Sequence, residues 1–374
     1  MATNKHELRN NKQVLLGLVK AGLWERDVEL RKYGATDYSQ ILQLAMEQSV
    51  VGLVAAGLER VKDMKVPQEW ALQFIGQTLQ IEQRNKAMNG FIAELVEKMR
   101  EAGIYTLLVK GQGVAQCYEK PLWRPSGDVD FLLSEENYKK AKEFLLPLSS
   151  GNKNEERYSR HLGMSIGEWY VEIHGTLRTG LSARVDKIVD AVQNNVFYGG
   201  KVRSWMNGKT QMFLPAPTED VFLVFTHFIK HFYKEGMSLR QVCDWCRLLY
   251  TYRGELDYGL LESWIRKTGL MSEWQGFAAV AVEYLGMPED AMPLIKFRDE
   301  SLEFRDRLKD REYRKYKKKA EKIIRFILNG SHGKVKDTWR IGKIFPWHTF
   351  KFLPSIFLNV NGLKIKERIL MVHD

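Results

Sequence analysis

The chain has 374 residues and a net charge of +11, with 44% hydrophobic and 28% charged residues. This composition predicts a globular, soluble protein that is long enough for two or three domains with cores of their own. No apolar run approaches the length of a membrane span, and the first residues lack the apolar core of a signal peptide. Three cysteines do not suggest a disulfide framework, so we expect a reducing, cytoplasmic location.

Residues 1–88 carry apolar side chains at helical spacing and no chemically distinctive motif. Spacing of this kind predicts amphipathic helices. We therefore expect an N-terminal helical region, for which a purely scaffolding role is one interpretation.

The turn after the first predicted strand is the first feature with a chemical meaning. Residues 104–109 form an apolar, β-branched run, which predicts a buried strand. The four residues that follow the strand are Lys110, Gly111, Gln112 and Gly113. Glycines let the backbone turn sharply and lie close to a ligand. Because residues 112–119 are predicted to form a helix, the free N–H groups at its start would form a phosphate cradle.

Two aspartates lie two positions apart in the next predicted strand, residues 128–133. Side chains at this spacing point to the same face of a strand, so Asp128 and Asp130 project together. Paired carboxylates repel each other unless a cation lies between them, and Mg²⁺ is usually held by one or two carboxylates with substrate phosphates. A phosphate-binding turn followed by a carboxylate pair predicts metal-assisted phosphoryl or nucleotidyl transfer.

The order of strand, glycine-rich turn, helix and Asp-x-Asp strand resembles the nucleotidyltransferase superfamily of the DNA polymerase β type. More narrowly, it resembles the bacterial group catalogued as uncharacterised nucleotidyltransferases. The superfamily signature has Gly followed by Gly or Ser, whereas here Gln112 holds the second position and Gly113 comes one place later. The resemblance implies that the N-terminal helices form a cap or a substrate-side domain.

The resemblance also implies further site residues. A third carboxylate is needed on a neighbouring strand, and Glu172 is the best candidate, with His174 beside it to orient a ligand or to cap the strand. Arg124 and Ser126, which precede the Asp-x-Asp strand, would lie in the nucleotide site.

Plainer interpretations exist for each of these residues. An Asp-x-Asp at a strand edge is often a solvated polar face, and Lys110 can be an ordinary lysine at the end of a strand. Arg124 can pair with Asp128, and Ser126 can be a turn residue. The turn upstream and Glu172 downstream together favour the catalytic interpretation.

The other elements before residue 215 are assigned from periodicity and turn residues. They are a helix at 135–145 after Ser134, a loop at 147–154, strands at 162–166 and 169–173, a helix at 185–192, and edge strands at 196–202 and 211–214 around Asn207-Gly208. Pro215-Ala-Pro217 predicts a domain boundary.

Helical spacing resumes after residue 217, and residues 239–245 resemble a motif of the same group and of toxin-type relatives. The resemblance implies that His231, Arg240 and Asp244 line the base or acceptor side of the cleft. The alternative is that Arg240 and Asp244, four positions apart on a helix, form an ion pair that fixes helix packing.

Four possible zinc ligands also occur here, namely His227, His231, Cys243 and Cys246. The cysteines lie in a segment with helical spacing and lack the glycine-bearing knuckle of zinc ribbons, and the histidines lie in a nearly all-apolar helix. The pattern therefore disfavours both a structural zinc and a redox Cys-x-x-Cys.

The last part of the chain combines basic and aromatic segments. Residues 305–325 carry eleven Lys/Arg and four Asp/Glu within a long predicted helix at 301–328. A charge run is usually a solvated face, but it can also attract a nucleotide, RNA or a membrane surface. The aromatic, proline-broken stretch at 344–358 can pack on the body of the protein, or contact a partner or lipid headgroups.

These observations predict an α+β fold with a small mixed-sheet nucleotidyltransferase core at residues 89–215. A helical region would precede it at 1–88, and a second would follow at 216–374.

The expected activity is Mg²⁺-dependent transfer of NMP from an NTP, such as ATP, to an unidentified acceptor hydroxyl. Asp128, Asp130 and Glu172 would hold one or two Mg²⁺ ions, and the turn at residues 110–113 would hold the β- and γ-phosphates. The alternatives are a catalytically inactive nucleotide- or partner-binding module, and an RNA-directed protein that uses residues 305–325.

Overall fold

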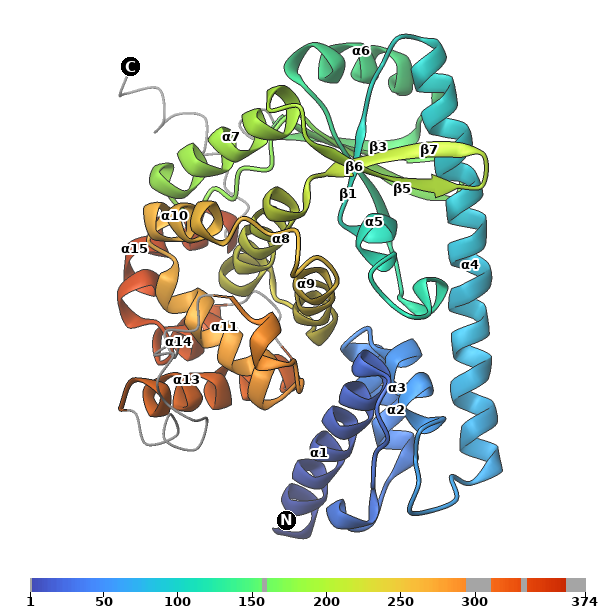
Figure 1. Cartoon of the computed structure of the whole chain (residues 1–374), viewed down its shortest axis with the longest axis vertical. Coiled ribbons are helices and arrows are strands. Elements are labelled where there is room, and N and C mark those ends of the chain that lie inside the picture. The colour runs from blue at the N-terminus through green and yellow to red at the C-terminus, as the bar shows by residue number, and fades with distance from the viewer. Residues whose placement is uncertain (1, 157–159, 294–310, 331–334, 361–374) are drawn as a thin grey trace.

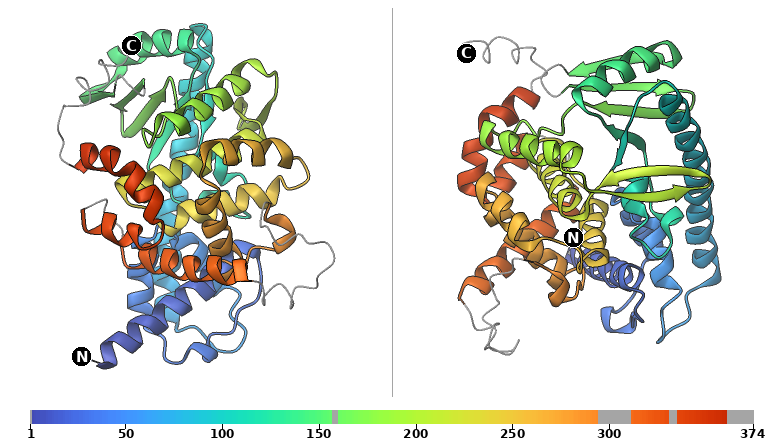
Figure 2. Two further views of the ribbon diagram at one scale, coloured as in Figure 1. Left: turned by 90° about the vertical axis from the view of Figure 1, so that its left-hand side faces the viewer. Right: turned by 45° about the horizontal axis from the view of Figure 1, so that its top comes forward.

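The computed structural model describes residues 2–156, 160–293, 311–330 and 335–360, and it shows helices arranged around a small sheet (Figure 1). The N-terminal helices are α1 (Ala2–Trp24), η1 (Arg31–Tyr33), α2 (Tyr38–Glu47), α3 (Val51–Leu58) and α4 (Gln68–Glu101). The 34-residue α4 runs along one side of the molecule, from the N-terminal helices to the sheet (Figures 1 and 2). It passes through residues 88 and 89 without a break, and the domain boundary expected there stays a prediction.

The sheet is mixed, as predicted. Its five strands lie in the order β1-β2-β5-β4-β3, with β2 and β5 parallel and the other neighbours antiparallel. The strands are β1 (Leu107–Val109), β2 (Asp128–Leu132), β3 (Ser150–Glu156), β4 (His161–Ile166) and β5 (Trp169–His174). A separate hairpin of β6 (Val202–Asn207) and β7 (Thr210–Pro215) turns at Gly208, where φ is 63°, and β7 packs against β1.

Short helices connect the strands. They are α5 (Gly111–Ala115), η2 (Pro121–Trp123), α6 (Glu135–Leu145), η3 (Leu146–Leu148) and α7 (Ala183–Tyr198). The hydroxyl of Ser134 accepts a hydrogen bond from the backbone N–H of Asn137, which caps α6 where the sequence predicts its start.

Four predicted elements differ from the structure. The loop predicted at 147–154 contains the start of β3, whose Ser, Gly, Asn and Lys residues give no strand pattern and which is defined by pairing with β4. The edge strand predicted at 196–202 is wrong, because Val196 lies four residues after Val192 on the buried stripe of α7. The helix predicted at 112–119 ends at Ala115, and the strand predicted at 104–109 is confined to Leu107–Val109.

Among the described residues after the hairpin, the regular elements are all helices. They are α8 (Pro217–Lys230), η4 (His231–Glu235), α9 (Leu239–Thr251), α10 (Tyr258–Thr268), α11 (Met271–Glu283), η5 (Glu289–Ala291), α13 (Arg311–Leu328), α14 (Val335–Gly342) and α15 (Pro346–Val360). The α+β class with helical flanks is therefore confirmed. Among the described residues, no helix is both long and apolar enough to span a bilayer.

The basic and aromatic segments both pack against the body of the protein. The buried face of α13 includes Ile323 and Ile327 and lies against α11. In α15, Phe352 is buried, whereas Trp347 is 73% exposed. Residues 301–310 of the predicted basic helix lie outside the described residues, and a lipid contact of the aromatic segment stays a prediction.

The two faces of the sheet differ in polarity. Val129, Phe131, Val171 and Ile173 pack against α4 and α6 in one apolar cluster. Residues at alternate positions of the same strands point to the opposite face, which carries the acidic side chains. A larger apolar cluster joins the N-terminal helices to the C-terminal ones.

Two glycines set the distance between α1 and α3. A Cβ atom on Gly22 would lie 2.0 Å from the carbonyl oxygen of Leu53, and one on Gly57 would lie 2.1 Å from that of Leu18. The two backbones are therefore in direct contact, which only glycine permits at these positions.

Gly57→Ala is expected to destabilise the protein by roughly 1–3 kcal/mol, because the new methyl group meets backbone that cannot move without separating α1 from α3. The matched control is Gly90→Ala in α4, where nothing lies within 4 Å of the added Cβ. There helix propensity alone predicts a gain of up to about 1 kcal/mol. Urea unfolding measures both, and equal stabilities of the two variants would contradict the close crossing.

Candidate functional site

Strand pairing brings three carboxylates together on the polar face of the sheet. Asp130 lies opposite Glu172 in the parallel β2–β5 register, and Asp128 lies opposite Tyr170. Residues in register point to the same face, so the pairing places Glu172 beside the two aspartates. Carboxylate oxygens of Asp128, Asp130 and Glu172 all lie within 4.8 Å of one another. This spacing allows a single divalent cation to contact all three.

Lys110 joins the same group from the end of β1. Its φ is 57°, a left-handed conformation that is uncommon for a residue with a side chain. Its Nζ donates a hydrogen bond of 2.8 Å to Asp130 Oδ1. The strained turn thus carries a cation that is paired with the carboxylate cluster.

Two histidines complete the cluster. His174 Nε2 is 2.7 Å from Asp130 Oδ1, and His161 Nε2 is 3.1 Å from Glu172 Oε2. The rings stack with centroids 4.7 Å apart, because the β4–β5 register places His161 opposite His174. Sequence reasoning missed His161. The hairpin predicted from residues 162–166 and 169–173 would have revealed it if each strand had been extended by one residue.

The three carboxyl groups differ in acidity. Repulsion by Asp130, together with burial, raises the pKa of Asp128. Burial alone would raise the pKa of Asp130, but Lys110 and His174 outweigh it and lower that pKa. Burial is also outweighed at Glu172, whose pKa is lowered by the nearby His161 and His174. At Asp128, in contrast, the nearby Lys110 and Arg240 do not outweigh the repulsion by Asp130 and the effect of burial.

The carboxylates face a cavity of about 370 Å³ whose opposite wall is formed by the end of α8 and by η4. This second wall carries His227, Lys230, His231, Lys234 and Glu235. The η4 segment is a single stretch of π-helix, a geometry that is often found at functional sites.

The histidines of the second wall are paired. His227 Nε2 and His231 Nε2 are 2.9 Å apart, and His231 Nδ1 is 3.0 Å from Glu235 Oε2. Burial lowers the pKa of His231 to about 4, against the opposing effect of Glu235. Burial also lowers the pKa of His227, with a contribution from the charge on Lys110. Both histidines are therefore neutral at pH 7.

A buried ion-pair network lies beside the cavity and links the sheet to α9. The Arg124 guanidinium donates to both carboxylate oxygens of Asp244, at 3.0 and 2.7 Å, and Tyr118 Oη donates to Asp244 Oδ1 at 2.8 Å. The alternative that Arg124 pairs with Asp128 is therefore wrong. The expected Arg240–Asp244 pair exists at 3.5 Å, but it is the longer contact.

Most of the predicted site residues line this cavity, and three do not. Those that line it are Lys110, Gly111, Arg124, Asp128, Asp130, Glu172, His174, His231, Arg240 and Asp244. Gln112 instead donates to Asn85 Oδ1 at 2.9 Å, and Gly113 packs against the side chain of Leu214. Ser126 accepts a hydrogen bond of 2.6 Å from Arg124, which orients that guanidinium.

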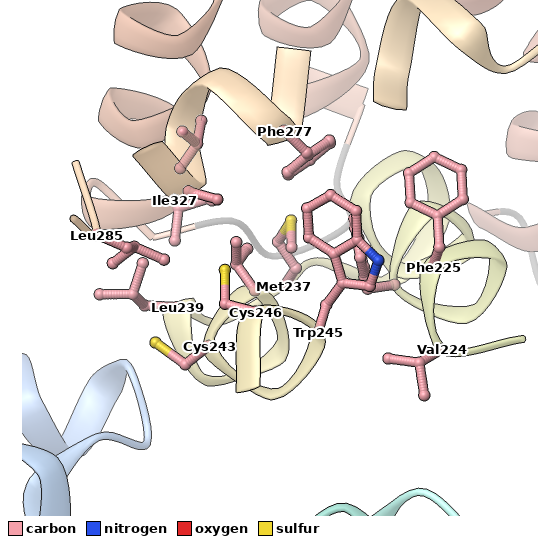
Figure 3. Packing of buried hydrophobic residues seen from close by; sticks show 14 of the residues in the cluster. Val224, Phe225, Met237, Leu239, Cys243, Trp245, Cys246, Phe277, Leu285 and Ile327 are labelled. Atoms are coloured by element: carbon pink, nitrogen blue, oxygen red, sulfur yellow. The ribbon is translucent and has the colours of Figure 1, made fainter. Parts of the chain in front are cut away.

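The four residues weighed as zinc ligands do not form one site. Cys243 and Cys246 lie among apolar side chains in the core of the C-terminal helices (Figure 3), and burial raises the pKa of both thiols. Within the described residues, the two groups with metal-binding spacing are His161–Glu172–His174 and Asp128–Asp130–Glu172.

An α+β fold whose polar cavity holds a carboxylate cluster is typical of enzymes that transfer phosphoryl or nucleotidyl groups with a divalent cation. The family model of uncharacterised nucleotidyltransferases matches residues 34–286, which is more than half of the chain, so the protein belongs to that family. No curated protein and no solved structure matches the chain.

The unequal acidities of the two aspartates predict opposite effects on stability. A raised pKa means that ionised Asp128 destabilises the metal-free protein above that pKa, so Asp128→Asn is expected to stabilise it at pH 7 by up to about 1 kcal/mol. Asp130 has a lowered pKa, and its ionised form stabilises the fold until the pH falls through that pKa. Asp130→Asn is therefore expected to cost about 3 kcal/mol, because it leaves Lys110 without its partner.

Chemical denaturation of both variants in EDTA at pH 7 measures these changes. The wild-type protein, denatured between pH 3 and 7, serves as the reference. Destabilisation by Asp128→Asn would show that the two aspartates do not repel each other in the metal-free protein.

Proposed function

We propose that this protein transfers NMP from an NTP to an acceptor hydroxyl and depends on Mg²⁺. The observation that carries the proposal is the cluster of Asp128, Asp130 and Glu172 in a cavity that Lys110 and Arg240 also line. Membership in the nucleotidyltransferase family supports it. In the reaction, an acceptor oxygen bonds to the α-phosphorus, the bond to the β-phosphate bridging oxygen breaks, and pyrophosphate leaves.

The carboxylate cluster fits Mg²⁺ on chemical grounds. All three ligands are oxygens, which this hard cation prefers. The pKa of Asp128 is raised because Asp130 repels its negative charge, and a cation bound by both carboxylates would relieve this repulsion. When bound, Mg²⁺ would neutralise the carboxylates and polarise the α-phosphate.

Two cationic side chains are placed to bind the phosphates. Lys110 lies next to the carboxylates, where it contacts Asp130. Arg240 lines the cavity, and its buried Nε has no hydrogen-bond partner in the described structure. Burial, and to a lesser extent the nearby charge of Arg124, lowers the pKa of Arg240. A bound phosphate oxygen would accept a hydrogen bond from the unpaired Nε and would also compensate the buried positive charge.

The second wall offers a base for the acceptor. Because His231 Nδ1 faces Glu235, the carboxylate favours the tautomer with the proton on Nδ1, and His231 Nε2 then accepts a hydrogen bond from His227 Nε2. The neutral pair of His231 and His227 can therefore take up the proton that the acceptor hydroxyl loses. A carboxylate that orients an imidazole is the arrangement used in general-base catalysis.

The described part of the basic segment has a structural role. The apolar face of α13 is buried against α11, which accounts for the helix without a nucleic-acid partner. The inactive binding module and the RNA-directed protein stay alternative predictions.

The position of the radioactive label in the product tests the reaction class. With [α-³²P]NTP, Mg²⁺ and a cell extract as the source of acceptors, the protein is expected to transfer the label to a new product and release pyrophosphate. The double variant Asp128→Asn/Asp130→Asn is expected to lose at least about 10³-fold in rate, because both metal ligands lose their charge. Transfer of label from [γ-³²P]NTP instead, or full activity of the double variant, would contradict the proposal.

His231→Gln tests the acceptor-side base. We expect kcat to fall by roughly 10²–10⁴-fold, while the Kd of Mg²⁺·NTP from calorimetry stays close to the wild-type value. Because the basic form of His231 exists above its pKa of about 4, wild-type kcat should fall as the pH drops through about 4. A fall centred near 6.5, the usual histidine value, would argue against this residue.

A further inference from the structure

Glu172 has a second set of neighbours whose chemistry differs from that of the aspartates. Its Oε2 lies 3.1 Å from His161 Nε2 and 3.5 Å from His174 Nε2. In a tetrahedral metal site with bonds of about 2.1 Å, the ligand atoms are about 3.4 Å apart. The two measured separations therefore match the edges of such a site, and all three donor atoms lie within 4.8 Å of one another.

The imidazole of His161 points to an additional ligand. Its Nε2 is buried and forms no hydrogen bond in the described structure, although the carboxylate of Glu172 is close by. Buried polar atoms normally have a partner, so this geometry calls for an explanation. A metal ion bound by both Glu172 Oε2 and His161 Nε2 supplies one, because each atom then directs a lone pair at the ion.

The three side chains are held on a rigid support. His161 begins β4, while Glu172 and His174 end β5, and the two strands are paired antiparallel from end to end. All three side chains line the cavity, so an ion from solution can reach them. Ligands mounted on neighbouring strands keep their spacing better than ligands on loops.

We propose that His161, Glu172 and His174 form a second metal site, which binds a transition-metal dication of the Mn²⁺ to Zn²⁺ series. Two imidazole nitrogens with one carboxylate suit these ions, whereas Mg²⁺ prefers an all-oxygen set such as Asp128, Asp130 and Glu172. Glu172 belongs to both sets, so its carboxylate would be shared between the two sites. To bind the ion, the imidazole of His174 would turn out of its stacked arrangement with His161 and give up its contact with Asp130.

The second site would change the cation chemistry of the cavity. Two dications that share a carboxylate bind phosphate oxygens from two sides, as in enzymes with two metal ions about 3.5–4 Å apart. The site goes beyond the proposed nucleotidyl transfer, since its donor set stands whether or not the protein turns over an NTP.

Cobalt absorption spectroscopy tests the site without any assay of activity. Co²⁺ is titrated into the wild-type protein in the presence of a large excess of Mg²⁺, and the visible d–d bands report nitrogen and oxygen ligands. We expect one Co²⁺ per chain that Mg²⁺ does not displace and Zn²⁺ does. His161→Gln is expected to weaken Co²⁺ binding at least about tenfold. The matched control, Asp128→Asn, changes only the all-oxygen set and should keep the cobalt bands.

Each contrary outcome overturns the proposal. The proposal is wrong if the wild-type protein shows no d–d bands with Co²⁺, or if Mg²⁺ displaces the bound Co²⁺. It is also wrong if the wild type and His161→Gln bind Co²⁺ with equal affinity. Circular dichroism verifies that the variants are folded, and the wild-type competition with Mg²⁺ and Zn²⁺ does not depend on any variant. Calorimetry of Mg²⁺·NTP on the same samples separates the two proposals, because the nucleotide can fail to bind while the cobalt site persists.

Discussion

The arrangement of the cavity depends on keeping one carboxylate, Asp130, charged inside the protein. Its side chain is almost fully buried, and a buried charge is tolerated only when cations and hydrogen bonds compensate it. The compensation comes from Lys110 on one side and His174 on the other. Lys110 directly follows β1 and His174 ends β5, and these two strands flank β2, so the strand order β1-β2-β5 is itself a requirement of the site.

A second buried ion pair fixes the other wall of the cavity relative to the first. Arg124 lies just before β2, and its partner Asp244 lies in α9, the helix that also carries Arg240. Arg247, one turn further along α9, donates to the backbone carbonyls of Cys117 and Leu23. The sheet, the N-terminal helices and the C-terminal helices thus meet at α9, which sets the width of the cavity.

Local patterns in the sequence correctly predicted the features that depend only on residues close together in the chain. Alternation along one strand was enough to place Asp128 and Asp130 on the same face, and the α+β class followed from the resemblance to the nucleotidyltransferase family. The partner of Arg124 could not be found in this way, since Asp244 is 120 residues away and the pairing exists only after α9 packs against the core. The helical spacing did find Arg240–Asp244, but it could not show that Arg124 holds Asp244 more closely.

The residues whose positions were predicted wrongly or missed also depend on contacts between distant parts of the chain. Gln112 stands at a signature position, yet its buried amide donates to Asn85 of α4, a partner 27 positions earlier in the chain that no local pattern reveals. His161 was missed because its role arises from antiparallel register with β5 rather than from any motif. Residues 147–154 gave no strand pattern because β3 is formed by pairing with β4 and not by apolar alternation.

The size of the cavity bears on the acceptor of the proposed reaction. Pockets for small molecules have volumes of about 300–1,000 Å³, and at about 370 Å³ this one is near the lower limit. A nucleotide with its cation would take most of that space, between the carboxylates on one wall and Arg240 on the other. The acceptor then has room to insert its reacting hydroxyl beside His231, while the rest of it stays outside. Selection of the acceptor would therefore depend on surfaces around the opening rather than on the carboxylate cluster.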